Sequence, residues 1–370
     1  MRASNFFIIL LIILLLAVIF TKEDTLKIGY IGPLSGGVSF IGEDEVRAIE
    51  FSVNKINKES GINGEKVEII FEDGKCDPKE AAIAADKLIN IDKVKIILGG
   101  FCSGETLAIA PIAETNKVIL LSTQSASPDI TNAGEYVFRT FPSDAYRGKK
   151  YAELIKSMNI TKVATLTEQT SFAKGLQDTF KKEFERYNGK IIAEEYSFGA
   201  TDFKVQLEKI KNENPEAIFV IAQGGNSGLL AIKQIKEMGM NITLFGTYVF
   251  LSESVLKTAE NSAEGMKILD SSSKIQDRGL VDEYEELFDR KPSYTSILGA
   301  KYDALNILKD SIEECKEVNT ECIKDYLYNI TEYNGLIGNY SFDENGDVVG
   351  VKHSLWEISN GKAVDKGVFN

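Results

Sequence analysis

Short apolar runs alternate with amphipathic segments along most of the chain. The first run, 25–32, precedes a segment over 43–59 in which Val46, Ile49, Val53 and Ile56 recur at helical spacing. Similar apolar runs predict further strands at 66–73, 94–100, 117–122, 162–168, 190–198, 216–223 and 242–247. Helical segments fill most of the gaps, and this alternation predicts an α/β fold with mostly parallel sheets flanked by helices.

Two helix starts carry local signals. Asp77 followed by Pro78 predicts an N-cap and first turn for a helix over 77–90. Ser103 also falls where a helix should begin, which favours an N-cap there. Pro111 predicts that this second helix kinks or breaks after about two turns.

The pattern divides the chain into two lobes, because one sheet containing every predicted strand would be too wide. The boundary is expected near 138–148, where a strand ends and Pro142 precedes a new helix. The serine-rich run 269–277 predicts a second joint. The tail, 334–362, has Asn-Gly turns between alternating residues and predicts antiparallel hairpins.

The N-terminus predicts export. Residues 6–20 contain no polar side chain, follow Arg2, and end where the chain turns polar. The run is slightly shorter than the roughly 20 residues of a spanning helix. A cleaved signal peptide and a retained anchor over 1–24 both stay open, and either places the body outside the cytoplasm.

Composition excludes several function classes. The formal net charge of −13 argues against a nucleic-acid partner. The chain has one histidine, His353, which argues against histidine-based catalysis and against a histidine-rich metal site. Four cysteines in an exported chain predict two disulfides, and no C-x-x-C spacing suggests zinc.

The glycine-rich stretch 99–104, GGFCSG, admits three chemistries: a nucleophile loop, a phosphate cradle or a ligand clamp. A cysteine nucleophile needs a nearby base to form its thiolate, and the sequence offers none close by. The phosphate-binding spacing G-x-x-x-x-G-K-S/T is absent. A clamp therefore fits best, with the Ser103 hydroxyl and first-turn N–H groups facing a ligand carboxylate or another acceptor group.

Several motifs, in this order and spacing, resemble the leucine/isoleucine/valine-binding proteins of ABC importers, which are type I periplasmic binding proteins. They are IGPLSG, G-x-NG, EDGKCDP, GGFCSG, SASP and YVFRTFPSD. The resemblance covers nearly the whole chain after the N-terminal run. It implies two α/β lobes joined by three crossings, with lobe one at 25–143 and 272–346 and lobe two at 144–271 and 347–370. It also implies closure of the lobes over a ligand.

The resemblance implies a disulfide between Cys76 and Cys102, whose loops follow strands two and three, and a ligand contact for Ser103. Cys315 and Cys322 flank a turn between two helical segments. A local disulfide is expected there, with buried free thiols as the alternative.

The resemblance also implies a second pocket loop, 122–130. Its small hydroxyl residue should lie two places before Pro128, but Ala126 occupies that position. We expect Gln124 and Ser125 to contact ligand, with a serine-rich surface turn as the alternative.

Lobe two departs from the family pattern. Phe172 stands where amino-acid binders have tyrosine, Gln223 and Asn226 occupy the next loop, and Tyr248 replaces the carboxylate that pairs with a ligand ammonium. An unpaired buried ammonium is costly, so another acceptor is needed if an amino acid binds. Glu168 is the nearest candidate, although we favour a hinge or strand-end role for this carboxylate. The neutral polar groups favour an amide, a modified amino acid or another small polar ligand over free leucine.

The sequence thus predicts an extracytoplasmic solute-binding protein of an ABC importer that is not an enzyme. Its predicted partners are a small molecule and the membrane permease and ATPase subunits, without a cofactor, metal or nucleic acid. A ligand-sensing receptor domain of the same fold is the alternative.

Overall fold

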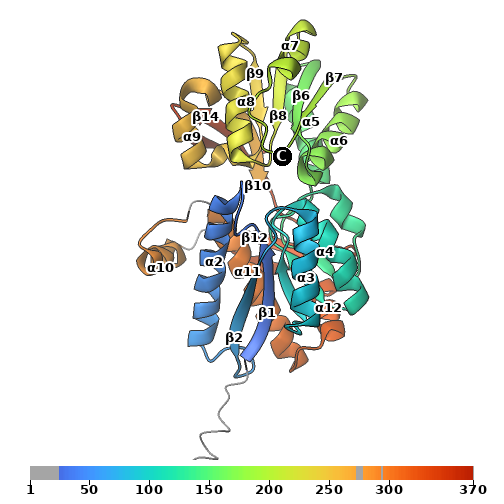
Figure 1. Cartoon of the computed structure of the whole chain (residues 1–370), viewed down its shortest axis with the longest axis vertical. Helices are drawn as coiled ribbons and strands as arrows, with labels where there is room; N and C mark the ends of the chain where they lie inside the picture. Colours follow the sequence, from blue (N-terminus) through green and yellow to red (C-terminus); the bar gives the residue numbers. More distant parts are fainter. Residues whose placement is uncertain (1–24, 272–277, 293–294, 370) are drawn as a thin grey trace, which may run out of the picture.

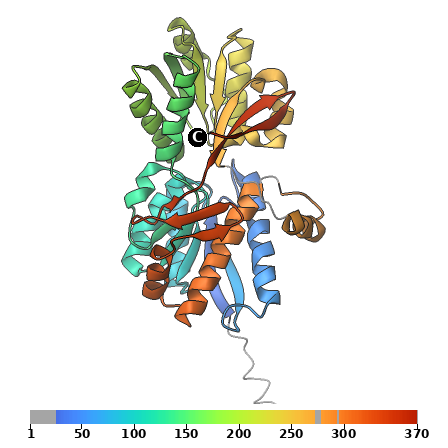
Figure 2. The same ribbon diagram turned by 180° about the vertical axis from the view of Figure 1, so that it is seen from behind.

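A computed structural model describes residues 25–271, 278–292 and 295–369. The predicted signal or anchor over 1–24 and most of the 269–277 joint lie outside these residues. Figures 1 and 2 show two lobes, one above the other. None of the described helices is long and apolar enough to cross a membrane.

The first lobe is built on a parallel sheet with strand order β2-β1-β3-β4-β5. Its strands are β1 (Thr25–Gly32), β2 (Lys66–Asp73), β3 (Ile96–Gly99), β4 (Ile119–Ser122) and β5 (Val137–Arg139). Side chains alternate between its faces: Ile96 and Leu98 meet one buried cluster, whereas Ile97 meets another. The flanking helices are α2 (Ser39–Lys58), α3 (Pro78–Asn90), α4 (Ser103–Asn116), α10 (Arg278–Phe288), α11 (Thr295–Cys315) and α12 (Thr320–Tyr328).

The second lobe has strand order β15-β14-β10-β9-β8-β6-β7. Its strands are β6 (Lys162–Glu168), β7 (Lys190–Tyr196), β8 (Ala217–Ile221), β9 (Thr243–Gly246), β10 (Lys267–Ser271), β14 (His353–Ser359) and β15 (Lys362–Val368). Pairing is parallel from β7 to β10 and antiparallel from β10 to β15. The helices of this lobe are α5 (Asp144–Ser157), α6 (Ser171–Arg186), α7 (Lys204–Asn212), α8 (Gly225–Glu237) and α9 (Glu253–Ala259). The predicted two-lobed α/β fold is confirmed.

Three short 3₁₀ turns are among the described elements: η1 (Pro128–Asn132), η2 (Tyr248–Leu251) and η3 (Glu260–Ala263). The predicted hairpins of the tail are also present, as β11 (Tyr333–Gly335), β12 (Gly338–Phe342) and β13 (Val348–Val349) in one antiparallel sheet and as the β14–β15 pair. Because β13 pairs with β12, the chain stays with the first lobe as far as Val349, beyond the expected boundary at 346.

The chain passes between the lobes at 140–143 and at 350–352, and it also changes lobe between Ser271, which ends β10, and Arg278, which begins α10. Figure 2 shows the last crossing from behind, where the red strands of the lower lobe continue into β14. We call 140–143 the first crossing and 350–352 the third crossing.

Two helix predictions have different outcomes. Asp77 caps α3 as expected, because its Oδ1 accepts the N–H groups of Lys79 and Glu80 at 2.8 and 3.0 Å. The predicted break at Pro111 is wrong, because α4 continues through it to Asn116. Ile109, Ala110 and Ala113 around the proline are buried in the lobe, so packing outweighs the local preference.

Candidate functional site

The loop 99–104 turns sharply because of its two glycines. Gly99 and Gly100 have positive φ angles of 139° and 51°. A Cβ at Gly99 would lie 2.2 Å from the carbonyl oxygen of Ile31, and one at Gly100 would lie 2.1 Å from Thr106 Oγ1. Only glycine fits both positions, and the turn brings α4 directly off β3.

Cys102, not Ser103, is the N-cap residue of α4, and Ser103 is the first helical residue. Glu105 reaches back from the first turn and accepts the Cys102 N–H at 2.9 Å. Its other oxygen accepts the Cys76 N–H at 2.9 Å. Burial raises the pKa of Glu105 to about 7, against the opposing effect of these N–H groups.

Both predicted disulfides are present. Cys76 and Cys102 are bonded with their Cα atoms 5.3 Å apart, and Cys315 and Cys322 are bonded with a Cα separation of 6.0 Å. Strands β2 and β3 are not neighbours, because β1 lies between them, so the first disulfide spans β1. Cys102 is therefore a structural tether at the edge of the cleft.

Ser103 and the loop after β4 are held together. The Ser103 Oγ is buried and accepts the Ser127 N–H at 3.1 Å. Ser125 turns its hydroxyl into the first lobe, where it donates to the Gly100 carbonyl at 2.7 Å. Gln124 faces the opposite way, and its Nε2 is buried without a hydrogen-bond partner among the described residues.

A buried ion pair supports the same loop. Lys301 on α11 contacts both Glu45 on α2 and the Thr123 hydroxyl with its ammonium group. Tyr30 donates its hydroxyl proton to Glu45 at 2.6 Å. Because an unpaired charge is costly in such an interior, these contacts fix the loop in one position.

The second lobe presents an aromatic pair toward the cleft. Phe172 on α6 and Tyr248 on η2 meet edge to face with ring centroids 5.7 Å apart. Tyr248 also packs against the cluster of the first lobe that contains Phe101 and Cys102. Tyr248 therefore bridges the two lobes.

Glu168 has a structural role at the end of β6. One oxygen accepts the N–H groups of Gln223 and Gly224, both at 2.8 Å, and the other accepts the Ser227 hydroxyl at 2.6 Å. Glu168 is thus a structural carboxylate at the end of a strand, and its side chain is fully buried. The loop it holds places Gln223 at the cleft and leaves Asn226 exposed.

The lobes are closed on each other. Gln223 Nε2 donates to Cys76 Sγ at 3.0 Å across the cleft. The remaining cavity has a volume of about 20 Å³, enough for one water. Its lining comes from both lobes and the first crossing: Ile41, Phe101, Gln124, Phe141, Tyr248, Asp270, Ser296 and Ile297.

Asp270 is the acidic residue of this lining, and sequence reasoning missed it. It follows the buried residues of β10 and pairs with Arg147, whose Nη1 lies 3.1 Å from Asp270 Oδ1. Burial raises the pKa of Asp270, while Arg147 opposes the shift. The sequence signal that could have identified Asp270 is a polar residue at the carboxyl end of a buried strand.

Of the predicted contacts, the structure brings Gln124 and Tyr248 into one cavity, with Phe172 edge to face against Tyr248. Ser103 and Gln223 lie beside it on opposing loops. Ser125 turns into the first lobe, and Asn226 is exposed.

The chain matches known proteins over most of its length. It is 28% identical over 340 residues to the leucine-, isoleucine-, valine-, threonine-, and alanine-binding protein of Pseudomonas aeruginosa, covering 90% of each chain. The leucine binding protein LivK of Thermotoga maritima has a TM-score of 0.86 and 26% identity, over 94% of this chain and 99% of that one. A solute binding protein of an ABC transporter from Rhodopseudomonas palustris, solved with 3,4-dihydroxy benzoic acid, has a TM-score of 0.80 and 25% identity, over 94% and 98%.

The family model for periplasmic binding proteins matches residues 25–360, which include the described strands from β1 to β14 and every residue of the cleft lining. With its two hinged lobes and the closed cavity between them, this chain belongs to the periplasmic binding protein family.

Proposed function

We propose that the protein captures a small amino acid with an apolar side chain in the inter-lobe cleft and delivers it to an ABC importer. The relatives named above support this role, since they include binding proteins for apolar amino acids and for an aromatic acid. The partners would be a membrane permease with its ATPase, and the site of action would be outside the cytoplasm.

The observation that carries the proposal is the mixed lining of the closed cavity. Ile41, Phe101, Phe141 and Ile297 supply an apolar wall, whereas Gln124 and Asp270 supply a donor and an acceptor. A hydrophobic amino acid has a matching apolar side chain and two charged groups. The Asp270 carboxylate would accept hydrogen bonds from the ligand ammonium. It would thus supply the acceptor that the ligand needs, because Tyr248 occupies the position of the usual carboxylate.

The carboxylate of the ligand would meet the loops of the first lobe. The Ser103 hydroxyl and the free N–H groups at the start of α4 lie there, together with the unpaired Gln124 amide. The second lobe would close Phe172, Gln223 and Tyr248 over the bound molecule. Entry requires opening, because the closed cavity holds only one water.

Calorimetric titration with leucine and related ligands tests the proposal. Leucine should bind, whereas 4-methylpentanoate, which lacks the ammonium, should bind at least tenfold more weakly, a difference of about 1.4 kcal/mol. If neither leucine, isoleucine nor valine binds but 3,4-dihydroxybenzoate does, the amino-acid assignment is wrong.

Asp270→Asn should weaken leucine binding by at least tenfold, because it removes the charge that faces the ammonium. The matched control is Asp86→Asn on the exposed side of α3, which should bind leucine normally. Leucine binding by Asp270→Asn at the wild-type affinity would remove Asp270 from the site.

A further inference from the structure

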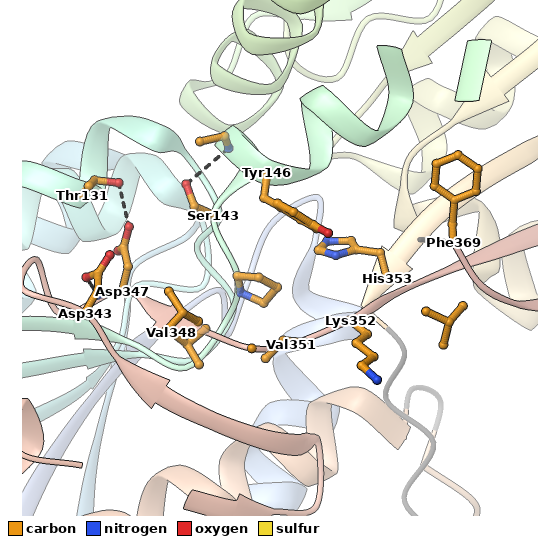
Figure 3. Close-up of a pocket in the computed structure, with 15 residues that line it drawn as sticks. Thr131, Ser143, Tyr146, Asp343, Asp347, Val348, Val351, Lys352, His353 and Phe369 are labelled. Atoms are coloured by element: carbon orange, nitrogen blue, oxygen red, sulfur yellow. Dashed lines mark hydrogen bonds between the residues drawn. The ribbon is translucent and has the colours of Figure 1, made fainter. Parts of the chain in front are cut away.

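A second hollow lies at the hinge, outside the ligand cleft. It has a volume of about 540 Å³, within the range of small-molecule sites. We call it the hinge groove and define it by Pro142, Tyr146, Val348, Val351, Val368 and Phe369. Figure 3 shows these elements around it: the start of α5, the third crossing and the end of β15.

The hinge groove gathers exposed apolar side chains from separate elements. Tyr146 is 46% exposed, Val349 43% and Val368 47%, and all three belong to its lining. Contiguous exposed apolar surface on a soluble lobe commonly marks a binding site. Tyr146 and Phe369 add two aromatic rings to the lining, and the Lys150 ammonium lies over both, 5.4 and 5.9 Å from their centroids. An aromatic lining favours an aromatic ligand.

The lining contains two carboxylates, those of Asp343 and Asp347, and the ammonium of Lys352. Asp347 is paired with Arg139, whose Nη2 lies 2.7 Å from Asp347 Oδ2. Asp343 Oδ1 accepts the N–H groups of Asn345 and Asp347, at 2.9 and 3.0 Å. Lys352, by contrast, is an exposed ammonium on the third crossing.

His353 adds no positive charge to the groove near neutral pH. Burial, helped by Arg147 and Lys150, lowers the pKa of its imidazole to about 3. Its ring lies against Tyr146 with centroids 5.2 Å apart, and its Nδ1 has no hydrogen-bond partner among the described residues. The imidazole is therefore a neutral wall of the groove.

We propose that the hinge groove binds a small aromatic monocarboxylate, with the ring against Tyr146 and Phe369 and the carboxylate at Lys352. This site is separate from the cleft and goes beyond the proposed function. Residues of both the first lobe and the second lobe line it, so its shape changes when the hinge moves. A ligand there favours one hinge state over the other.

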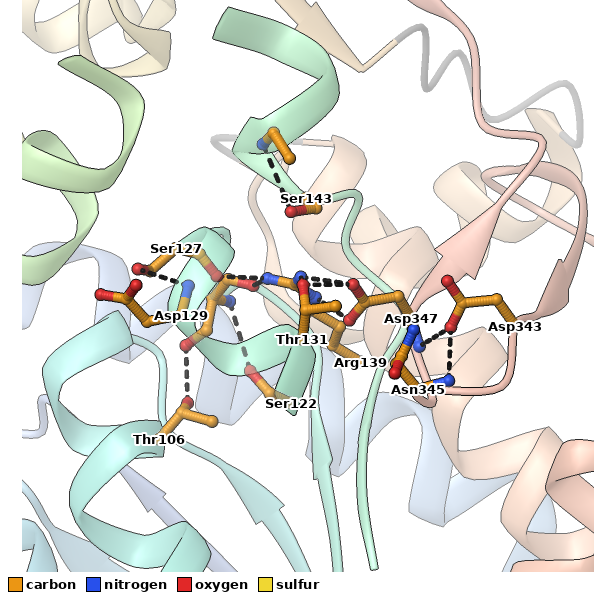
Figure 4. A network of polar contacts seen from close by, with 12 residues as sticks. Thr106, Ser122, Ser127, Asp129, Thr131, Arg139, Ser143, Asp343, Asn345 and Asp347 are labelled. Carbon is orange, nitrogen blue, oxygen red and sulfur yellow. Dashed lines mark hydrogen bonds and ion pairs between the residues drawn. The ribbon is translucent and has the colours of Figure 1, made fainter. Parts of the chain in front are cut away.

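A chain of hydrogen bonds connects the groove to the cleft. Figure 4 shows Arg139 between Asp347 and Ser127. Arg139 is fully buried, and its Nη1 donates to the Ser127 carbonyl at 2.7 Å. Ser127 in turn donates its N–H to Ser103 at 3.1 Å. A ligand that shifts Asp347 therefore acts on the loop that faces the cleft, and the two sites must affect each other reciprocally.

The single histidine provides a direct test with phenylacetate as the probe. In untagged protein labelled at histidine, millimolar phenylacetate should shift the ring signals of His353 in a saturable way. Val368→Asp and Lys352→Ala should each raise the phenylacetate Kd at least tenfold. The controls Val364→Asp and Lys362→Ala, on the same hairpin but outside the lining, should leave the Kd unchanged.

Two results would overturn the site: no shift of the His353 signals, or a shift that persists unchanged in Val368→Asp. The second would place phenylacetate in the cleft. Asp270→Asn separates this proposal from the previous one, because it should impair leucine binding and spare the Val368-dependent shift.

Coupling is tested by titrating leucine with and without saturating phenylacetate. The leucine Kd should change by a factor of five or more, and saturating leucine should change the phenylacetate Kd by the same factor. Equal leucine affinities in both titrations would overturn the connection between the sites.

Discussion

The carboxylates around the cleft differ in what their oxygens contact. Glu105 and Glu168 accept backbone N–H groups and hold loops, whereas Asp270 pairs with a side chain and lines the cavity. The sequence pointed to Glu168 because it ends a strand beside the cleft. It could not separate the two roles, since they depend on which loops fold over each strand end.

Glu168→Gln should lower the free energy of unfolding by about 2 kcal/mol. The amide of the variant has only one oxygen, so its NH2 group would face either the N–H groups of Gln223 and Gly224 or the Ser227 hydroxyl. A buried donor would then lose its hydrogen-bond acceptor. Urea denaturation measures the change. Glu195→Gln on β7 is the control, with an expected change within about 0.5 kcal/mol. Equal stabilities of the two variants would contradict the structural role of Glu168.

At the element scale, several stabilising features occur within a few residues at the start of α4. Two glycines turn the chain, Cys102 caps the helix, and Glu105 joins the cap to the loop of Cys76. The disulfide then fixes the loops after β2 and β3 on either side of β1. The rim of the cleft in the first lobe is therefore rigid before any ligand arrives.

Replacing Cys76 and Cys102 together by serine should cost about 3.5 kcal/mol, because the disulfide restricts the unfolded chain over the 26-residue separation. The matched pair, Cys315→Ser with Cys322→Ser, closes a shorter loop and should cost about 2.5 kcal/mol. Chemical denaturation of both double variants measures which one loses more free energy of unfolding. The opposite order would show that loop length does not control these contributions.

At the scale of the whole molecule, function depends on how closely the lobes approach. Gly175 on α6 faces the first lobe, and a Cβ there would lie 2.7 Å from Pro128 Cδ and 3.0 Å from Ser127 Oγ. Gly175→Leu should hold the lobes apart and weaken ligand binding at least tenfold. The free energy of unfolding without ligand should stay the same or rise by up to about 1 kcal/mol, since leucine favours a helix.

Calorimetry gives the affinity, and small-angle scattering reports whether ligand still compacts the Gly175→Leu variant. Lys181→Leu, on an exposed position of the same helix, is the control. Wild-type affinity in Gly175→Leu would show that binding does not require this approach of the lobes.

Buried acids also give the molecule a pH dependence. Burial raises the pKa of Glu105 to about 7 and those of Asp144 and Asp303 to about 6. Because these values exceed those of the unfolded chain, the folded protein binds more protons near pH 6. The free energy of unfolding should therefore rise as the pH falls from about 7.5 to about 5.5.

His353 has the opposite effect on this pH dependence. Its pKa of about 3 lies below the unfolded value of about 6.5, so its contribution to stability is lost as the pH falls from about 6.5 toward 3. The contribution of this one histidine is smaller than the combined contribution of the three acids. The free energy of unfolding should therefore still rise as the pH falls over this range. Urea denaturation at several pH values tests the sum, and a fall in stability over the upper range would contradict it.

The sequence by itself determined the class of the fold and most of the helix and strand order, and its resemblance to a known family implied the Cys76–Cys102 disulfide and the general place of the cleft. These depend on periodicity, turn residues and ordered motifs, which are local properties of the chain. The sequence did not determine the contacts of single side chains: Ser125 turns inward, Asn226 is exposed, and Asp270 lines the cavity from the end of β10. Only the tertiary structure decided these, because the direction and the partner of a side chain depend on segments that are distant in sequence.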